Sequence, residues 1–438
     1  MDQLFMFEPL SLEYLGAGAR LDGHEVRILD ARIDPDAETA ALDFEPDMIG
    51  LTAVTSQVNI VKAVAARLRA LCPKAFFVIG GHHATVRPAD FNESGFDAVV
   101  IGEGVVALRE ILAALTRGCG LHAIRGLAFP CPEAMHFTEP RVYTDLNALP
   151  FPDRSLTAQY RQHYFSEWFK PLASIRTSLG CTARCTFCSL WSITGGKYLR
   201  RDPDAVVAEL ASIEEPNVFF CDDESMCDAK RMQVLAEKIR QSGIRKRYFL
   251  YARADTIVRH PDLFTEWARI GLAQVFVGME DFSDERLAAM RKGVTTDQQE
   301  KAVRILEDLG VMTYAAFMVD PDYSWDDFRA LTAYVRRLRL NCVNFTILTP
   351  LPGTALRAAR ERDLISEKPE LCDMLHALVP TRLPMQEFYR EMDRLYTKAV
   401  PWYRSLPVLL KFGLHGLVLR LKLFSAFRQK VLQAHLDY

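Results

Sequence analysis

Three cysteines, Cys181, Cys185 and Cys188, stand at CxxxCxxC spacing just after an apolar, strand-like run at 172–175. Thiolates that converge from one short loop hold soft metal centres. With three protein ligands, a [4Fe-4S] cluster keeps one iron open, and a small molecule bearing an amine and a carboxylate could chelate that iron. A structural zinc site is the competing interpretation, but zinc commonly takes its remaining ligands from a second CxxC pair. Because Cys185 and Cys188 form the only CxxC in the sequence, the spacing favours an iron–sulfur cluster.

The cysteine loop resembles that of the radical S-adenosylmethionine (radical SAM) enzymes, in which a CxxxCxxC loop follows the first strand of a partial (β/α) barrel. Those enzymes carry an aromatic residue before the third cysteine, and Phe187 stands at that position. The resemblance implies that a [4Fe-4S] cluster on the three cysteines donates one electron to bound S-adenosylmethionine. The resulting 5′-deoxyadenosyl radical would abstract hydrogen from a substrate, and a reductase with flavodoxin or ferredoxin would supply the electron.

The region that carries the loop alternates between strand-like and helix-like segments. From 171 to about 355, six apolar runs are each followed by a helical pattern, which fits a (β/α)6 partial TIM barrel. The strands are predicted at 172–177, 217–221, 248–252, 274–278, 313–319 and 344–348. Active sites of such barrels form where the strands end, and the polar clusters of this region follow the predicted strand ends.

Those polar clusters suit the groups of S-adenosylmethionine. Carboxylates suit its amine and hydroxyls, an arginine suits its carboxylate, and backbone at a glycine suits the flat adenine. By the family pattern, Asp222, Asp223 or Glu224 lies near the amine. Arg253 and Glu280 lie near the carboxylate or the ribose, and Gly353 lies near the adenine. The usual GGE sequence after strand two is CDDE here, so the amine ligand stays open among the three carboxylates. Two further thiols, Cys221 and Cys227, are either hydrogen donors or buried small apolar residues.

Residues 1–140 show the same alternation of helix and strand. Helices are predicted at 11–22, 58–71 and 105–116, and strands at 26–29, 48–54, 75–79 and 98–101. This order argues for a doubly wound (Rossmann-like) sheet, whose binding edge is the set of loops at the carboxyl ends of the strands. Those loops are Thr52–Gln57, Gly80–Thr85 and Gly102–Gly104, and their glycines let the backbone approach a large ligand.

This half resembles the cobalamin-binding domain that precedes many radical SAM enzymes, among them the anaerobic magnesium-protoporphyrin ester cyclases and cobalamin-dependent methyltransferases such as the hopanoid C-3 methylases. The shared features are the EPLxLxYLxAxxRxxGHEVxxxD opening, the GGxHAT loop and the GEG loop. The resemblance implies that cobalamin is bound by these loops, with contacts from Thr55, Gly80, Gly81, His82, Gly102, Glu103 and Gly104. A degenerate domain that keeps the fold without binding cobalamin is the alternative.

Two features depart from that family. The first strand normally precedes the opening, but Glu8 follows closely on Met1, so either the strand is missing or the true start lies upstream. The DxHxxG sequence that supplies an axial histidine to cobalt is absent, and we interpret His24 as a surface turn residue. His82 and His83 could line a corrin face, whereas the competing interpretation is that they only shape the turn.

Composition limits what the protein can be. The 438 residues, with 49% hydrophobic and 25% charged side chains, are typical of a soluble globular protein. A net charge of −3 gives no polyanion-binding signal, which disfavours nucleic acid as a partner. No signal peptide or membrane-spanning apolar run is evident, and a thiolate-rich cluster needs a reducing compartment. The predicted location is therefore cytoplasmic.

The C-terminal segment has a pattern of its own. Between Trp402 and His435 it has no acidic residue, and its cations alternate with apolar residues. A basic, apolar helix of this kind suits a bilayer interface, which predicts peripheral contact through 402–435 with the inner membrane face and a lipid-like substrate. The alternative is a helical lid on the barrel whose cations face solvent. The six cations are Arg404, Lys411, Arg420, Lys422, Arg428 and Lys430.

The predicted fold is α/β in four parts: a Rossmann-like cobalamin-binding domain at 1–140, a connector at 141–170, a partial barrel at 171–355 and a helical C-terminal domain at 356–438. The leading function is cobalamin-dependent radical SAM methyl transfer to an unactivated carbon of an apolar, hopanoid-like substrate. The second candidate is an oxidative cyclase of the ester-cyclase type, without methyl transfer. A third, non-enzymatic candidate is a metal-stabilised scaffold at membranes, which would not cleave S-adenosylmethionine.

Overall fold

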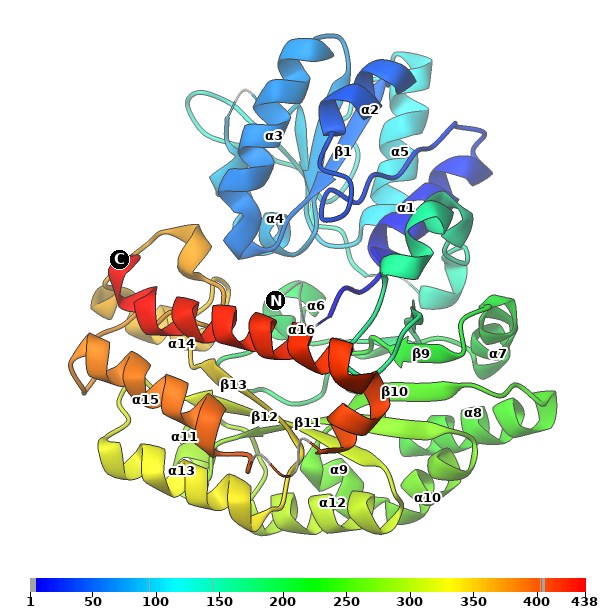
Figure 1. The fold of residues 1–438 in the computed structure, drawn as a ribbon. Coiled ribbons are helices and arrows are strands. Elements are labelled where there is room, and N and C mark those ends of the chain that lie inside the picture. Colours follow the sequence, from blue (N-terminus) through cyan, green and yellow to red (C-terminus); the bar gives the residue numbers. More distant parts are fainter. Residues whose placement is uncertain (1–4, 94, 144, 402, 404–405) are drawn as a thin grey trace. The chain divides into compact units, whose positions relative to one another are not determined.

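A computed structural model gives the fold (Figure 1) and describes residues 5–93, 95–143, 145–401, 403 and 406–438, apart from the side chains of 406–416 and 419. The chain divides into two compact units. The first comprises Met1–Cys181 with Ser189–Cys221, and the second comprises Thr182–Cys188 with Asp222–Tyr438. The division into four parts with three boundaries stays a prediction.

The first unit contains a five-stranded sheet. Its strands are β1 (Met48–Thr52), β2 (Phe76–Gly80), β3 (Ala98–Val100), β4 (Leu127–Phe129) and β5 (His136–Phe137), in the order β1-β2-β3-β4-β5. The first three strands pair in parallel, and the last two add as an antiparallel hairpin.

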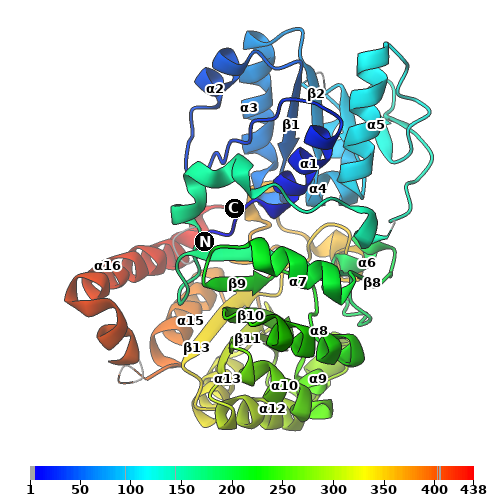
Figure 2. The same cartoon turned by 90° about the vertical axis from the view of Figure 1, so that its right-hand side faces the viewer.

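Helices cover both faces of this sheet (Figure 2). Helix α3 (Val58–Leu71) packs with α2 (Ala37–Phe44), and α1 (Leu10–Leu21) packs with α5 (Gly104–Arg117). Successive residues of β2 enter different cores: Ile79 is buried with Val61 of α3, and Val78 is buried with Ile111 of α5. Because successive strand residues point to opposite faces, this alternation confirms the doubly wound arrangement.

The strand predicted at 26–29 is not present. Residues 23–30 have no regular structure, although Ile28 is 7% exposed. Within the described residues β1 pairs only with β2, and no strand precedes α1. A segment without a neighbouring strand cannot form a hydrogen-bonded ladder, so this stretch is partly buried without being a strand.

The six strands of the predicted barrel are all present. In the first unit β6 (Leu172–Ile175) pairs in parallel with β9 (Asn217–Phe220). Helix α7 (Pro203–Ser212) precedes β9 in the connection between the two strands. Between them lie α6 (Leu190–Thr194) and a small hairpin of β7 (Ser178–Leu179) and β8 (Leu199–Arg200). In the second unit, four strands pair in parallel in chain order: β10 (Arg247–Ala252), β11 (Leu272–Glu280), β12 (Met312–Val319) and β13 (Cys342–Ile347).

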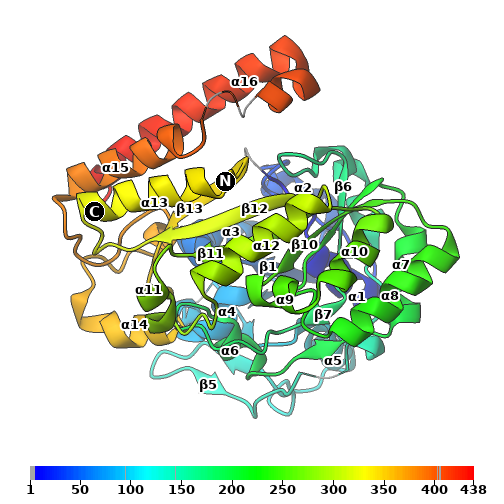
Figure 3. The ribbon, with the colours of Figure 1, turned by 90° about the horizontal axis from the view of Figure 1, so that it is seen from below.

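Helices flank the strands of the second unit, as the βα rhythm predicted (Figure 3). Two of them begin with a capping box, in which side chain and backbone at the helix start satisfy each other; the residue pairs are Thr295 with Gln298 and Ser324 with Asp327. The helices are α8 (Ala229–Ser242), α9 (Ala254–Arg259), α10 (Pro261–Arg269), α11 (Asp284–Ala289), α12 (Thr296–Asp308) and α13 (Trp325–Arg337).

The C-terminal part is helical, with α14 (Ala355–Arg360), α15 (Met385–Lys398) and α16 (Leu406–Gln433). Helix α15 lies against both α13 and α16 (Figure 3). In the described part of α16, the Phe427 ring packs edge-on against Tyr396, and Val431 is 6% exposed. Among the described residues, no helix combines the length and the apolar character needed to cross a bilayer.

Candidate active site

The cysteine loop begins at a turn that only glycine fits. Gly180 follows β7 and has φ +94°, and a Cβ at this position would collide with the backbone carbonyl of Lys197 before β8. Left-handed backbone of this kind is unfavourable for other residues. The turn therefore delivers the chain to Cys181 in a defined direction.

The second half of the loop is held by two backbone hydrogen bonds within the second unit. Thr186 N donates to Met290 O at 3.0 Å, and Leu356 N donates to Thr186 O at 2.8 Å. Cys188 N also donates to Cys185 O at 3.3 Å, which closes a turn between two of the cysteines. All three cysteines and Phe187 are partly exposed, so their side chains are accessible to a ligand.

Arg253, which follows β10, is the centre of the polar contacts near this loop. Its Nη1 lies 4.0 Å from Cys185 Sγ, its Nε donates to Asp255 Oδ1 at 2.9 Å, and its Nη2 donates to Lys292 O at 2.5 Å. A guanidinium can donate a hydrogen bond to a metal-bound sulfur. Arg253 therefore suits a position beside a metal-bound cysteine.

Glu280 lies at the end of β11 and is paired with a lysine that the sequence analysis missed. Lys292 Nζ lies 2.5 Å from Glu280 Oε1, and the two residues are only 7% and 8% exposed. Glu280 has φ +64° and sits at a bulge between β11 and β12, which turns the strand end. Because Lys292 contacts Arg253 through its carbonyl and Glu280 through its ammonium, it joins two of the predicted site residues.

Glu224 is the buried member of the three carboxylates after β9. It is 3% exposed, and desolvation raises the pKa of its carboxyl to about 7. Arg253 N donates to its Oε1 at 3.5 Å, and the Cys227 side chain also hydrogen-bonds to this carboxyl. Asp222 is also buried, whereas Asp223 is partly exposed, so the three carboxylates have different surroundings.

The two extra thiols have different environments. Cys227 Sγ lies 3.5 Å from Thr182 Oγ1 in the cysteine loop, and burial raises the pKa of its thiol. Cys221 instead packs in the first unit against the Leu10, Tyr14 and Val105 cluster, with its Sγ 3.3 Å from Ile175 O. The packing of Cys221 supports the interpretation as a small buried residue, whereas Cys227 contacts the cysteine loop.

The glycine loops of the first unit meet at one edge of its sheet. Gly81 has φ +96°, and a Cβ there would collide with the Thr52 side chain after β1. Thr85 Oγ1 donates to Gly81 O at 2.8 Å and accepts from Gly102 N at 3.0 Å. The loops after β1, β2 and β3 are thus connected. Val54, in the loop after β1, is 49% exposed.

The two histidines of the second loop have different roles. His83 is 1% exposed, and its ring nitrogens lie 3.0 Å from Thr55 Oγ1 and 2.9 Å from Asp90 Oδ2. Both nitrogens are therefore occupied, and His83 shapes the loop. His82 is partly exposed, its Nε2 lies 3.3 Å from Ser189 Oγ, and burial lowers the pKa of its imidazole.

Several other predicted cofactor contacts have a structural task in the fold. Glu103 caps α5, because its carboxylate accepts from Val105 N at 2.5 Å and Val106 N at 3.0 Å. Gly104 lies where a Cβ would be tightly packed against Leu15. Contacts of these residues, and of Thr55, Gly80 and Gly353, with a cofactor stay predictions. Gly353, with φ +77°, directly precedes α14, whose first turn anchors Thr186.

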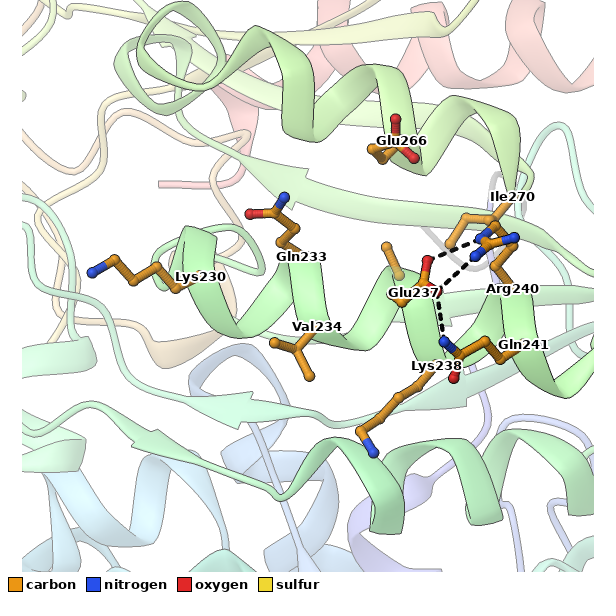
Figure 4. A pocket seen from close by; sticks show the side chains of 10 residues that line it. Lys230, Gln233, Val234, Glu237, Lys238, Arg240, Gln241, Glu266 and Ile270 are labelled. Carbon is orange, nitrogen blue, oxygen red and sulfur yellow. Dashed lines mark hydrogen bonds and ion pairs between the residues drawn. The ribbon is translucent and has the colours of Figure 1, made fainter.

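A hollow of about 620 Å³ lies elsewhere in the second unit, on the outer surface between α8 and α10 (Figure 4). Its carboxylates already pair with neighbouring arginines, Glu237 with Arg240 and Glu266 with Arg269. No strand end opens into it, so we do not assign the chemistry there. In the part of the chain that the structure describes, no three His, Cys, Asp or Glu side chains are grouped as ligands of a single metal ion.

Comparison with known families gives two matches. The B12 binding domain model matches residues 5–112, and the radical SAM superfamily model matches residues 175–335. Both resemblances predicted from the sequence are therefore confirmed, and the order of the two domains is the predicted order.

Individual proteins align over most of the chain. The hopanoid C-3 methylase of Methylococcus capsulatus is 30% identical over 422 residues, which cover 93% of this chain and 80% of that protein. The anaerobic magnesium-protoporphyrin IX monomethyl ester cyclase of Rubrivivax gelatinosus is 26% identical over 78% of this chain and 64% of its own length. The methyltransferase TsrM of Kitasatospora setae, solved with cobalamin and a [4Fe-4S] cluster, superposes with a TM-score of 0.65 at 21% identity, over 78% of this chain and 72% of its own.

Proposed function

Because the chain belongs to the cobalamin-dependent radical SAM methyltransferase family, we propose that it methylates an unactivated carbon of an apolar, hopanoid-like substrate. The observation that carries the substrate class is the similarity to the hopanoid C-3 methylase, which extends over nearly the whole chain. The ester cyclases align over a smaller part of both chains and at lower identity, which supports methyl transfer over oxidative cyclisation.

The cofactors of this family are a [4Fe-4S] cluster, S-adenosylmethionine and cobalamin. When bound, the cluster supplies the electron that cleaves S-adenosylmethionine, and cobalamin carries the methyl group. The donor set fits the cluster: Cys181, Cys185 and Cys188 offer three accessible sulfurs from one loop, which leaves the fourth iron open. The connected glycine loops with the exposed apolar Val54 fit the edge of a large flat ligand.

The polar residues after the strands divide the remaining work. Glu224 faces the amine of S-adenosylmethionine, since a carboxyl desolvated by burial gains from the N–H donors of an amine. Arg253 holds the Cys185 side of the loop and offers its guanidinium to the carboxylate. Lys292 pairs with one oxygen of Glu280, which leaves the second oxygen to accept from the ribose hydroxyls. Asp222, Asp223, Phe187 and Gly353 complete the proposed site.

The proposed partners follow from this chemistry. Radical chemistry of this type needs one electron per cleavage, which we assign to a flavodoxin or ferredoxin with its reductase. The proposed location is the cytoplasm, where thiolates stay reduced.

Peripheral membrane contact is proposed through the exposed face of α16. Val418, Leu421 and Phe424 leave 44%, 56% and 38% of their side chains exposed, and Lys422 is exposed beside them. One expected lipid contact is less suitable, because Arg428 makes a two-pronged ion pair with Asp393 of α15, at 2.6 and 2.8 Å. Two of the other predicted cations, Arg404 and Lys411, lie outside the described side chains.

Liposome flotation tests this contact. The double variant Leu421→Ser, Lys422→Glu should bind anionic vesicles less than the wild type, since it removes apolar area and reverses one charge. The matched control is Val234→Ser, an equally exposed apolar residue on α8, which should bind as the wild type does. Equal binding by all three proteins would mean that α16 is a lid and makes no membrane contact.

The substrate class is tested by product mass. The anaerobically reconstituted protein is given S-adenosylmethionine, cobalamin and a reductant, together with a pentacyclic triterpenoid of the hopane type or magnesium-protoporphyrin monomethyl ester. The proposal expects a triterpenoid heavier by one CH2 unit and an unchanged porphyrin. A porphyrin product with added oxygen or a new ring, and no methylated triterpenoid, would instead establish the cyclase function.

A further inference from the structure

We propose that a buried charged network on the open edge of β6 positions the cysteine loop, with Arg201 as the central positioning residue. The inference rests on the proposed role of the three loop cysteines as cluster ligands. Strand β6 pairs along one edge with β9, and Ile175 O at the end of that edge accepts from Cys221 N at 2.9 Å. Within the described residues no strand pairs with the other edge, so its amides and carbonyls need different partners.

Charged side chains are the partners of Ser174 on that open edge. Its N–H donates to the carboxylate of Glu8, and its carbonyl accepts from Arg154 Nη2 at 2.6 Å. The Glu8 side chain is fully buried and also pairs with Arg161. Hydrogen bonds to ionised groups are roughly twice as strong as neutral ones. Glu8 and Arg154 thus replace a neighbouring strand, which gives the glutamate of the EPLxLxYL opening a task.

Arg201 makes hydrogen bonds of the same kind to the backbone between β6 and the first cysteine. Its Nη1 donates to Arg176 O at 2.8 Å, and its backbone N donates to Thr177 O at 2.9 Å. Both carbonyls belong to the short segment that leads to Gly180 and Cys181. One arginine therefore fixes the path of the chain into the cysteine loop, because it donates to the carbonyls of two successive residues.

Arg201 is itself held in place. It is 5% exposed, its Nη1 lies 2.5 Å from Glu209 Oε2 on α7, and Tyr14 OH on α1 lies 3.2 Å away. The other oxygen of Glu209 accepts from Arg154 Nη2 at 2.7 Å. The two arginines share one buried carboxylate, so the contacts at Ser174 and at Arg176 form one unit. A network in which each charge is paired restricts side-chain motion, as a positioning role requires.

The test compares Arg201→Met, Arg201→Lys and a matched control, Arg109→Met, after anaerobic reconstitution to equal iron content. Arg109 makes an ion pair with Asp22 in the same unit, at 2.7 Å, but both side chains are about one third exposed. The readout is the electron paramagnetic resonance signal of the reduced cluster, with and without S-adenosylmethionine. A residue that only stabilises the fold would lower the melting temperature without changing that signal.

In Arg201→Met we expect the S-adenosylmethionine-dependent change of the signal to be lost. Cleavage per cluster should fall about tenfold or more, because a 1 Å misplacement can cost roughly a hundredfold in rate. Arg201→Lys should recover part of both, since an ammonium can still donate to Arg176 O, and Arg109→Met should match the wild type. If Arg201→Met does not fold, Arg201→Lys and Glu8→Gln decide by the same signal.

A wild-type signal in the folded Arg201 variants would overturn the inference, even with a lower melting temperature. A wild-type protein that holds no [4Fe-4S] cluster and does not cleave S-adenosylmethionine would overturn the proposed function instead. The two failures are therefore distinguishable.

Discussion

The proton on Glu224 provides a test of its proposed position at the amine of S-adenosylmethionine. Burial raises the pKa of this carboxyl to about 7. A group with that pKa is protonated in about 0.9 of the molecules at pH 6, about 0.5 at pH 7 and about 0.1 at pH 8. An amine that chelates iron is neutral and can donate its N–H groups to a nearby carboxylate, which favours the ionised form of Glu224. Binding should therefore release about those fractions of a proton from Glu224 at each pH, in addition to any proton that the amine itself loses on chelation.

Isothermal titration calorimetry measures this release. S-adenosylmethionine is titrated into the reconstituted protein in two buffers with different ionisation enthalpies, and the difference in heat counts the protons. Glu224→Gln cannot ionise, so it should release fewer protons than the wild type, by about those fractions at each pH. The matched variant Asp223→Asn changes the neighbouring, partly exposed carboxylate and should release protons as the wild type does.

Three results would refute this reasoning. Release that is constant between pH 6 and pH 8 would mean that no group with a pKa near 7 takes part. Wild-type release by Glu224→Gln would place the titrating group elsewhere. Loss of release in Asp223→Asn alone would assign the amine to Asp223.

Three further predictions concern the two units. Replacing any one cysteine of the CxxxCxxC loop by Ala should abolish 5′-deoxyadenosine formation, as measured by chromatography, and full activity in one variant would sink the ligand assignment. Gly81→Ala should lower the free energy of unfolding by about 1–2 kcal/mol or more and reduce bound cobalamin, because φ is +96° and a Cβ collides with a side chain. The control is Gly23→Ala, where φ is +85° but no atom lies close to the added Cβ. This control has the backbone strain without the collision and should keep its cobalamin. Burial and the nearby Glu8 carboxylate raise the pKa of Glu13 to about 7, so its contribution to stability is present below about pH 4.5 and is lost as the pH rises through about 7. Urea unfolding at several pH values should show this loss in the wild type but not in Glu13→Gln, and identical pH profiles would contradict it.

Much of the fold follows from local patterns in the sequence. All six barrel strands lie within a few residues of their predicted positions, because buried parallel strands are continuous apolar runs between amphipathic helices. The cysteine loop, Arg253 and Glu280 could be proposed from the sequence because active-site residues follow strand ends. These features depend on spacing along the chain, which a sequence contains directly.

The remainder depends on contacts between distant segments. Lys292 is one of many lysines in the sequence, and only the folded chain places its ammonium on Glu280 and its carbonyl on Arg253. The apolar run at 26–29 has strand character, but a strand also needs a partner. Likewise, the acid-free C-terminal segment was expected to keep its cations for solvent or lipid, whereas Asp393 of another helix pairs with Arg428. A clearer signal for the last case would have been the acidic positions on α15.

The central claim, cobalamin-dependent radical methyl transfer, is tested most directly by counting products from S-adenosylmethionine labelled in its methyl group. The measurement is quantitative mass spectrometry of an anaerobic reaction with a hopane-type substrate, with and without added cobalamin. We expect equal amounts of 5′-deoxyadenosine, S-adenosylhomocysteine and a product that carries the intact labelled methyl group. Formation of all three should depend on the cluster, and no product should form when cobalamin is withheld. An unlabelled product, or a labelled product formed equally well without cobalamin, would contradict it.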